Sequence, residues 1–116
     1  MSELYTHLQN NSGFTVSKEL KHFNGLGFAV SLKSNTVIID SELLNESLFN
    51  AIVQNLQITI KENEFIGAWL DSQTFKIHFD INTIHTDLDS AIKTAKENEQ
   101  IAIYNLGTQR EIRLIT

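Results

Sequence analysis

Alternation of apolar and polar residues predicts a β-hairpin in the centre of the chain. Residues 65–70 and 74–81 alternate with the period of two that is typical of half-buried strands, and Ser72-Gln73 lies between them as a loop. This loop sets which residues face each other across the hairpin. On the predicted core face, Leu70 pairs with Phe75, Ala68 with Ile77 and Ile66 with Phe79; on the opposite face, Trp69 pairs with Lys76, Gly67 with His78 and Phe65 with Asp80.

A second hairpin is predicted in the N-terminal half. Residues 27–33 alternate large apolar with small or polar side chains, as strands do. Ser34-Asn35 then supplies a turn, and residues 36–39 provide the returning strand. We therefore expect these two segments to pair with each other.

Shorter patterns predict the remaining strands. Residues 14–16 indicate a short strand, followed by a single helical turn that carries Leu20 and Phe23. Residues 101–106 and 111–115 predict a last hairpin around Gly107.

Apolar residues at helical spacing predict three helices. The first covers residues 2–9, with Ser2 placed to cap it, and the second follows a cap at Asp40 or Ser41. Residues 57–61, which follow the second stripe, fit a helix and a strand equally well. The third begins at a capping box with Thr86 as its N-cap. The second stripe consists of Leu44, Leu48, Ile52 and Leu56, and the third of Leu88, Ala91, Ile92 and Ala95.

These elements together predict one α+β domain over residues 1–116. No linker, repeat or low-complexity segment interrupts their order. We expect a single antiparallel or mixed sheet of about five to six strands with two to three helices packed on it.

Composition excludes several functional classes. The chain has no cysteine, so disulfides, thiolate zinc sites and cysteine nucleophiles cannot form. Neither G-x-G-x-x-G nor the P-loop spacing is present, and we predict no cofactor. The net charge of −5 and the pI near 5.2 disfavour direct binding to nucleic acid. With no apolar stretch of membrane-spanning length and no secretion signal, we expect a cytoplasmic protein without membrane contact.

The only tryptophan marks the candidate binding surface. Hairpin alternation places Trp69 on the face opposite the core, where an exposed tryptophan would anchor a partner. A helix covering that face would instead bury it, and the sequence leaves both readings open. The candidate partner-binding residues are Trp69, Asp71, Lys76, His78 and Asp80.

A metal-dependent enzyme is the rival interpretation. His78 and Asp80 are two apart on one strand and so share a face, and His85 follows closely. Imidazole and carboxylate together could bind a divalent cation or exchange protons. However, polar residues on a wet strand face need no further explanation, and we assign no metal site and no catalytic residue.

Several segments resemble small uncharacterised proteins of phages, plasmids and integrated mobile elements. The resemblance rests on residues 13–16 and 27–31, on Gly67-Ala68-Trp69-Leu70-Asp71 and Ile77-His78-Phe79-Asp80, and on residues 100–106. It implies a protein that binds host machinery, with inhibitors of defence systems, including anti-CRISPR proteins, as relatives in kind.

The resulting functional prediction is a non-enzymatic binding protein. We expect it to inhibit or modulate a host protein or nucleoprotein complex. The small metal-dependent enzyme built on His78, Asp80 and His85 stays as an alternative, and so does a structural homo-oligomer such as a homodimer.

Overall fold

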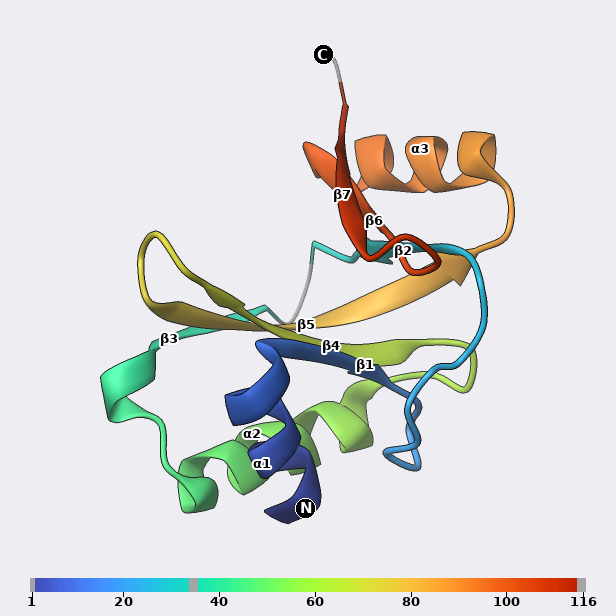
Figure 1. Cartoon of the computed structure of the whole chain (residues 1–116). Helices are drawn as coiled ribbons and strands as arrows, with labels where there is room; N and C mark the ends of the chain where they lie inside the picture. The colour runs from blue at the N-terminus through green and yellow to red at the C-terminus, as the bar shows by residue number, and fades with distance from the viewer. Residues whose placement is uncertain (1, 34–35, 115–116) are drawn as a thin grey trace.

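Long strand β5 (Lys76–His85) organises the sheet. The computed structural model describes residues 2–33 and 36–114, over which the chain forms three α-helices and a seven-stranded antiparallel sheet (Figure 1). This confirms the predicted α+β class, with one strand more than expected. The other elements are α1 (Ser2–Asn11), β1 (Gly13–Val16), β2 (Phe28–Ser31), β3 (Val37–Asp40), a 3₁₀ turn (Ser41–Leu43), α2 (Glu46–Thr59), β4 (Phe65–Asp71), α3 (Leu88–Glu97), β6 (Ala102–Asn105) and β7 (Arg110–Arg113).

Both edges of β5 are occupied by other strands. On one edge lies β4, which in turn pairs with β1. On the other edge, β3 lies opposite residues 76–79 and β2 opposite residues 82–85, so the two short strands follow each other end to end. The sheet then continues from β2 through β6 to β7.

The predicted hairpin between residues 27–33 and 36–39 is therefore wrong. After β2 the chain keeps running along β5, where the Leu32 amide donates to the Ile81 carbonyl at 2.8 Å, instead of turning back. Both strands thus pair with a segment far away in sequence. The predicted turn at Ser34-Asn35 lies outside the described residues.

The β4–β5 hairpin exists, but its register differs from the prediction by two residues. Its loop is longer than expected, because the Phe75 amide donates to the Asp71 carbonyl at 2.8 Å and Phe75 adopts a positive φ of 57°. A shift of two preserves which face each side chain occupies. The observed pairs include Leu70 with Ile77, Ala68 with Phe79, Ile66 with Ile81, Trp69 with His78, Gly67 with Asp80 and Phe65 with Asn82.

Two hydrophobic cores lie on the same face of the sheet. Strand alternation puts Phe79 and Val30 on one side, although the first packs with α1 and α2 and the second with α3. Figure 1 shows the twist that separates these two ends of the sheet. The larger core is centred on the fully buried Phe49, Val53, Ile66 and Phe79; the smaller one contains Val30, Ala91, Ala95 and Ile103.

Two helices are capped by residues other than those predicted. Asn45, not Asp40 or Ser41, caps α2, because its side chain accepts from the Leu48 amide at 2.8 Å. The helix runs to Thr59, and the backbone at Ile60 is extended. Residues 57–59, which the sequence left open between helix and strand, therefore belong to the helix.

The third helix begins one residue later than predicted. Asp87, not Thr86, caps α3 by accepting from the Ser90 amide at 3.0 Å. Leu88 is 40% exposed and does not belong to the buried stripe, which Ala91 and Ala95 form.

The N-terminal segment follows the prediction in part. Helix α1 extends to Asn11, two residues beyond the expected end, and β1 lies where a short strand was predicted. No helical turn forms at Leu20, whose φ is 66°. Residues 17–23 instead fold back on β1, where the Phe23 amide donates to the Thr15 carbonyl at 3.0 Å.

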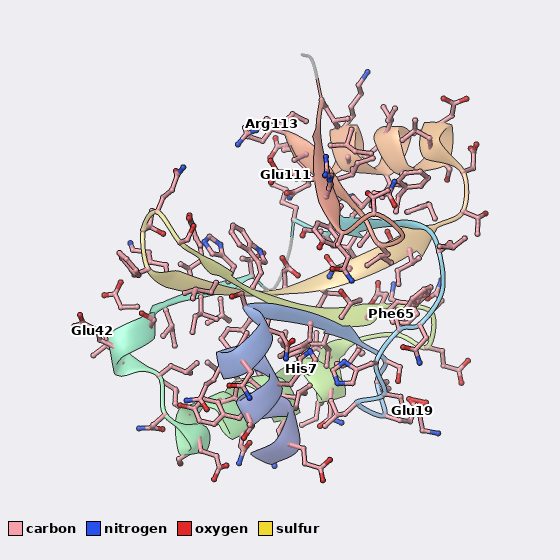
Figure 2. All side chains as sticks on the ribbon, viewed as in Figure 1. His7, Glu19, Glu42, Phe65, Glu111 and Arg113 are labelled. Carbon is pink, nitrogen blue, oxygen red and sulfur yellow. The ribbon has the colours of Figure 1, made fainter. Side chains whose placement is uncertain are left out.

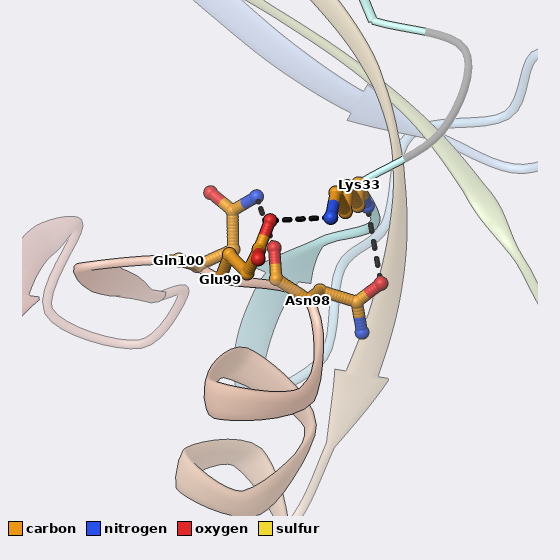
Figure 3. A network of polar contacts seen from close by, with 4 residues as sticks. All are labelled: Lys33, Asn98, Glu99 and Gln100. Carbon is orange, nitrogen blue, oxygen red and sulfur yellow. Dashed lines mark hydrogen bonds and ion pairs between the residues drawn. The ribbon is translucent and has the colours of Figure 1, made fainter.

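Polar contacts tie the end of α3 to Lys33, two residues after β2. The Lys33 amide donates to Asn98 Oδ1 at 3.1 Å, and Lys33 Nζ pairs with Glu99 (Figure 3). Gln100 Nε2 donates to the Asn98 carbonyl at 3.2 Å. The ion pair and the Lys33 amide contact are exposed, so the part-buried contact between Gln100 and the Asn98 carbonyl is the part of this network that water screens least.

Among the described residues, no helix combines the length and apolar character needed to cross a membrane.

Candidate functional site: the helix-free face of the sheet

A row of four residues crosses the sheet on the face away from the helices. Trp69 on β4 pairs with His78 on β5, with Gly13 beyond it on β1 and Ile38 beyond His78 on β3. Trp69 is 44% exposed and Ile38 is 53% exposed. The structure thus places Trp69 at the surface, so of the two sequence interpretations the exposed one holds.

Trp69 and His78 stack on each other. Their ring centroids are 4.2 Å apart, and the ring planes differ by only 10°. Directly opposite residues in an antiparallel pair bring their side chains close enough for such a contact. The result is a flat aromatic platform with Ile38 as its apolar neighbour.

One face of the indole has no cross-strand side chain against it. The imidazole occupies the side of Trp69 that looks toward β5, so the other side looks toward β1. There the cross-strand neighbour is Gly13, which has no side chain. A Cβ at that position would lie 3.4 Å from Trp69 Cβ and only 2.9 Å from the Ala68 carbonyl oxygen, so glycine allows β1 to approach β4 closely.

Asp80 is buried beside this platform. It lies two residues after His78 on the same face and is only 5% exposed. Ser31 Oγ donates to its Oδ2 at 2.9 Å, whereas its Oδ1 has no hydrogen-bond partner among the described residues. Ser31 also contacts Asn82 Oδ1 at 3.1 Å, so the three side chains form a small polar cluster.

Gly67 makes room for that cluster. It pairs with Asp80, and a Cβ on it would lie 2.6 Å from Asp80 Oδ1 and 2.2 Å from Asn82 Nδ2. The two polar side chains therefore lean over the bare backbone of β4. This explains how polar residues become buried on a face without a helix.

Burial changes the protonation of two groups on this face. It raises the pKa of Asp80 to about 6, while the side chains of Ser31 and Asn82 lower it by less. Burial also lowers the pKa of His78, an effect that the nearby Asp71 carboxylate partly opposes. At neutral pH the platform is thus uncharged and lies beside a carboxylate.

The next row along the strands carries charge. Asp71, Lys76 and Asp40 lie side by side on β4, β5 and β3. Hydrogen bonding from the Gln73 amide, at 2.9 Å from Oδ1, holds the pKa of Asp71 below its usual value. All five residues predicted for partner binding therefore lie on this one face, although the cross-strand partner of Trp69 is His78 and not Lys76.

The ends of the same face do not extend the platform, because one end is covered by Phe23 and the other is formed by β7. Phe23 packs edge-on against Phe65, with ring centroids 5.5 Å apart, and so covers one end. Figure 2 shows Phe65 at that end, and Glu111 and Arg113 on β7, beyond β2 and β6 in the sheet order. Arg113 is paired with Glu111 at 3.2 Å.

His85 does not join His78 and Asp80. It lies on the opposite face of β5, where its ring nitrogens contact Thr83 Oγ1 at 2.8 Å and Ser90 Oγ at 3.0 Å. Across residues 2–33 and 36–114, no group of three or more His, Cys, Asp or Glu side chains is placed to hold a metal ion. The geometry therefore gives the metal-dependent alternative no support.

Sequence reasoning missed the residues that complete the row and the cluster. Gly13 and Ile38 join Trp69 and His78 only because β1 and β3 pair with β4 and β5, and Ser31 reaches Asp80 only because β2 pairs with β5. The one sequence signal for the place of Ser31 was the alternation of Ala29 and Ser31 with apolar residues, which puts both on the face away from the core.

Comparison with known protein families, with curated proteins and with solved structures finds no match to this chain.

Proposed function

We propose that this chain is a non-enzymatic binding module that contacts a larger protein through the platform face, defined as Ile38, Trp69, Asp71, His78 and Asp80. Its effect on that protein, or on a nucleoprotein complex containing it, is inhibition or modulation. This is the mode of action that the resemblance to mobile-element proteins and to inhibitors of the anti-CRISPR kind implies.

The observation that carries the proposal is the exposure of a stacked tryptophan. Trp69 is held in one orientation by His78, yet 44% of it remains accessible to solvent. A rigid aromatic side chain loses little conformational entropy when it binds, and tryptophan is strongly enriched among residues that dominate interface energies. Ile38 adds adjoining apolar surface.

A matched pair of variants tests the proposal. Wild-type protein, Trp69→Ala and Leu88→Ala are used as baits in a lysate of the source organism. Leu88 is the control because it is exposed to a similar degree, 40%, but lies on α3. We expect a stoichiometric partner to be retained by wild type and by Leu88→Ala, and lost by Trp69→Ala.

Purified components then quantify the effect. Truncating an interface tryptophan weakens binding by about 2 kcal/mol or more, which is roughly a thirtyfold change in Kd. Circular dichroism must show that Trp69→Ala remains folded. Equal binding by both variants contradicts the assignment of the face, and the absence of any stoichiometric protein partner contradicts the binding function itself.

A further inference from the structure

The β1 side of the Trp69 indole offers a flat aromatic surface beside a residue that has no side chain. The ring is one wall, fixed from behind by His78 at 4.2 Å, and the backbone of Gly13 is the floor. We call this the indole slot. Because its wall is flat and its floor carries no side chain, a planar group fits it better than a branched or tetrahedral one.

The charges around the indole slot favour a cation. Asp71 lies two residues from Trp69 on the same face of β4, and Asp80 and Asp40 are also on this face. The opposing cation in these rows is Lys76, which already lies between Asp71 and Asp40. Arg113 is on β7 and paired with Glu111. The platform itself adds no positive charge, because burial lowers the pKa of His78.

These two properties together select one chemical group. Guanidinium is planar and positively charged, is less strongly hydrated than ammonium, and stacks on aromatic faces. It can also donate to a carboxylate while it is stacked. A nucleobase would be flat as well, but its phosphate would approach Asp71 in a chain of net charge −5.

We propose that the indole slot receives the guanidinium group of an arginine side chain on the protein that this chain binds. Asp71 is the carboxylate that pairs with the guanidinium edge. The proposal rests on the binding function argued above and specifies its partner: a protein segment with an exposed arginine in a positively charged surrounding.

Trp69 supplies its own reporter for the test. As the only tryptophan, it gives a single indole N–H signal in a proton–nitrogen NMR spectrum of labelled protein. The probes are the capped tripeptides Gly-Arg-Gly, Gly-Lys-Gly and Gly-Glu-Gly, with uridine monophosphate as the nucleotide probe. We expect the arginine peptide to shift this signal saturably, the lysine peptide to bind several-fold more weakly, and the other two probes to cause no saturable shift.

Two acid variants locate the charge contribution. Asp71→Asn should weaken arginine-peptide binding about threefold to fivefold, as expected for loss of one partly exposed charge-assisted contact. Asp89→Asn, on the first turn of α3, removes the same charge elsewhere and should leave the affinity unchanged. In Trp69→Ala, the Gly13 amide signal replaces the lost reporter, and we expect it to stay unmoved by the peptide.

Each other outcome overturns the arginine assignment. Equal shifts with the arginine and glutamate peptides show that the slot does not select charge, and tighter binding of uridine monophosphate makes it a nucleobase site. A signal that moves with protein concentration alone makes a second copy of this chain the occupant. If no probe binds while Trp69→Ala still loses the captured partner, the proposed function stands and only the arginine assignment fails.

Discussion

Replacing Asp80 with asparagine should stabilise the protein, and the gain should depend on pH. Asp80 is 5% exposed, and its Oδ1 has no hydrogen-bond partner among the described residues. Asparagine has nearly the same shape and can still accept the Ser31 hydrogen bond. The substitution therefore removes the capacity to become charged while leaving the packing intact.

The size of the gain follows from the pKa of Asp80. Folding raises it from 3.8 to about 6, mainly through burial. Each pKa unit corresponds to about 1.4 kcal/mol, so ionised Asp80 lowers the free energy of unfolding by about 3 kcal/mol. Asp80 is neutral in both states below pH 3.8, and the favourable contribution of its neutral form is lost as the pH rises through about 6. Asp80→Asn should thus exceed wild type by about 3 kcal/mol at pH 8 but by only about 1 kcal/mol at pH 4.5.

Urea unfolding at these two pH values measures the difference. Circular dichroism gives the free energy of unfolding of each protein, and the gap between them isolates Asp80 from all other titrating groups. The groups that face Asp80 are His78 on its own strand, Asn82, Ser31 on β2, and Trp69 beside the bare Gly67 on β4. All four are present in both proteins.

Asp71→Asn is the control with the opposite sign. Hydrogen bonding from the Gln73 amide lowers the pKa of Asp71 in the folded state, so its contribution is present above pH 3.8 and lost as the pH falls below it. Replacing this carboxylate should therefore lower the free energy of unfolding at pH 8 and have a smaller effect in acid. If Asp80→Asn and wild type differ by the same amount at pH 4.5 and pH 8, the reasoning about a buried charge is refuted.

Four further substitutions test the fold and the platform face. Ile77→Asp puts a charge into the larger core and should prevent folding, whereas Lys76→Asp on the exposed face should cost about 1 kcal/mol or less; similar melting temperatures would contradict the facing of β5. Gly67→Ala collides with the polar cluster and should lower the free energy of unfolding by about 1–3 kcal/mol in urea. Phe75→Gly relieves a positive φ of 57° at a 66% exposed residue, so it should raise the free energy of unfolding by about 1 kcal/mol. A lower free energy of unfolding would instead indicate that the Phe75 side chain packs in the free protein.

Fluorescence gives a separate check on Trp69. Its emission should be red-shifted in the free protein and move to the blue when the partner binds, because 44% of the side chain is exposed. Trp69→Ala should lower the free energy of unfolding by only about 1 kcal/mol, mostly from the lost stack with His78. Blue emission in the free protein, together with a collapsed melting temperature, would place Trp69 in a core.

Local patterns predicted the elements better than their partners. Alternation in residues 65–81 identified the central hairpin and its two faces, because side-chain facing depends only on a period of two. It could not fix the register, which depends on the loop, and nothing in the sequence marks Phe75 as the residue that adopts a positive φ. Helix α2 was found from its apolar stripe, whereas its cap at Asn45 required knowledge of where the chain turns.

The candidate site shows the same limit more clearly. Trp69, His78 and Asp80 were identified because they lie near one another in sequence on one hairpin. Gly13 and Ile38 come from strands at distant positions, and the sequence pattern suggested that residues 36–39 pair with residues 27–33. Which strands pair depends on packing throughout the core, so the alternation in one short segment does not predict its partner.

The end-to-end placement of β2 and β3 along β5 has a consequence during synthesis on the ribosome. Each of the first three strands takes its strand partners from β4, β5 or β6, and none pairs with another of the three. The sheet therefore cannot begin to assemble until β4 has emerged, and β2 and β3 stay without a partner until β5 follows. Before then α1 and α2 can cover at most the β1–β4 pair. Such long-range pairing slows folding and leaves apolar segments open to aggregation in the nascent chain. A ribosome stalled before β5 should thus carry a protease-sensitive chain, and protection should appear only once His85 has left the exit tunnel.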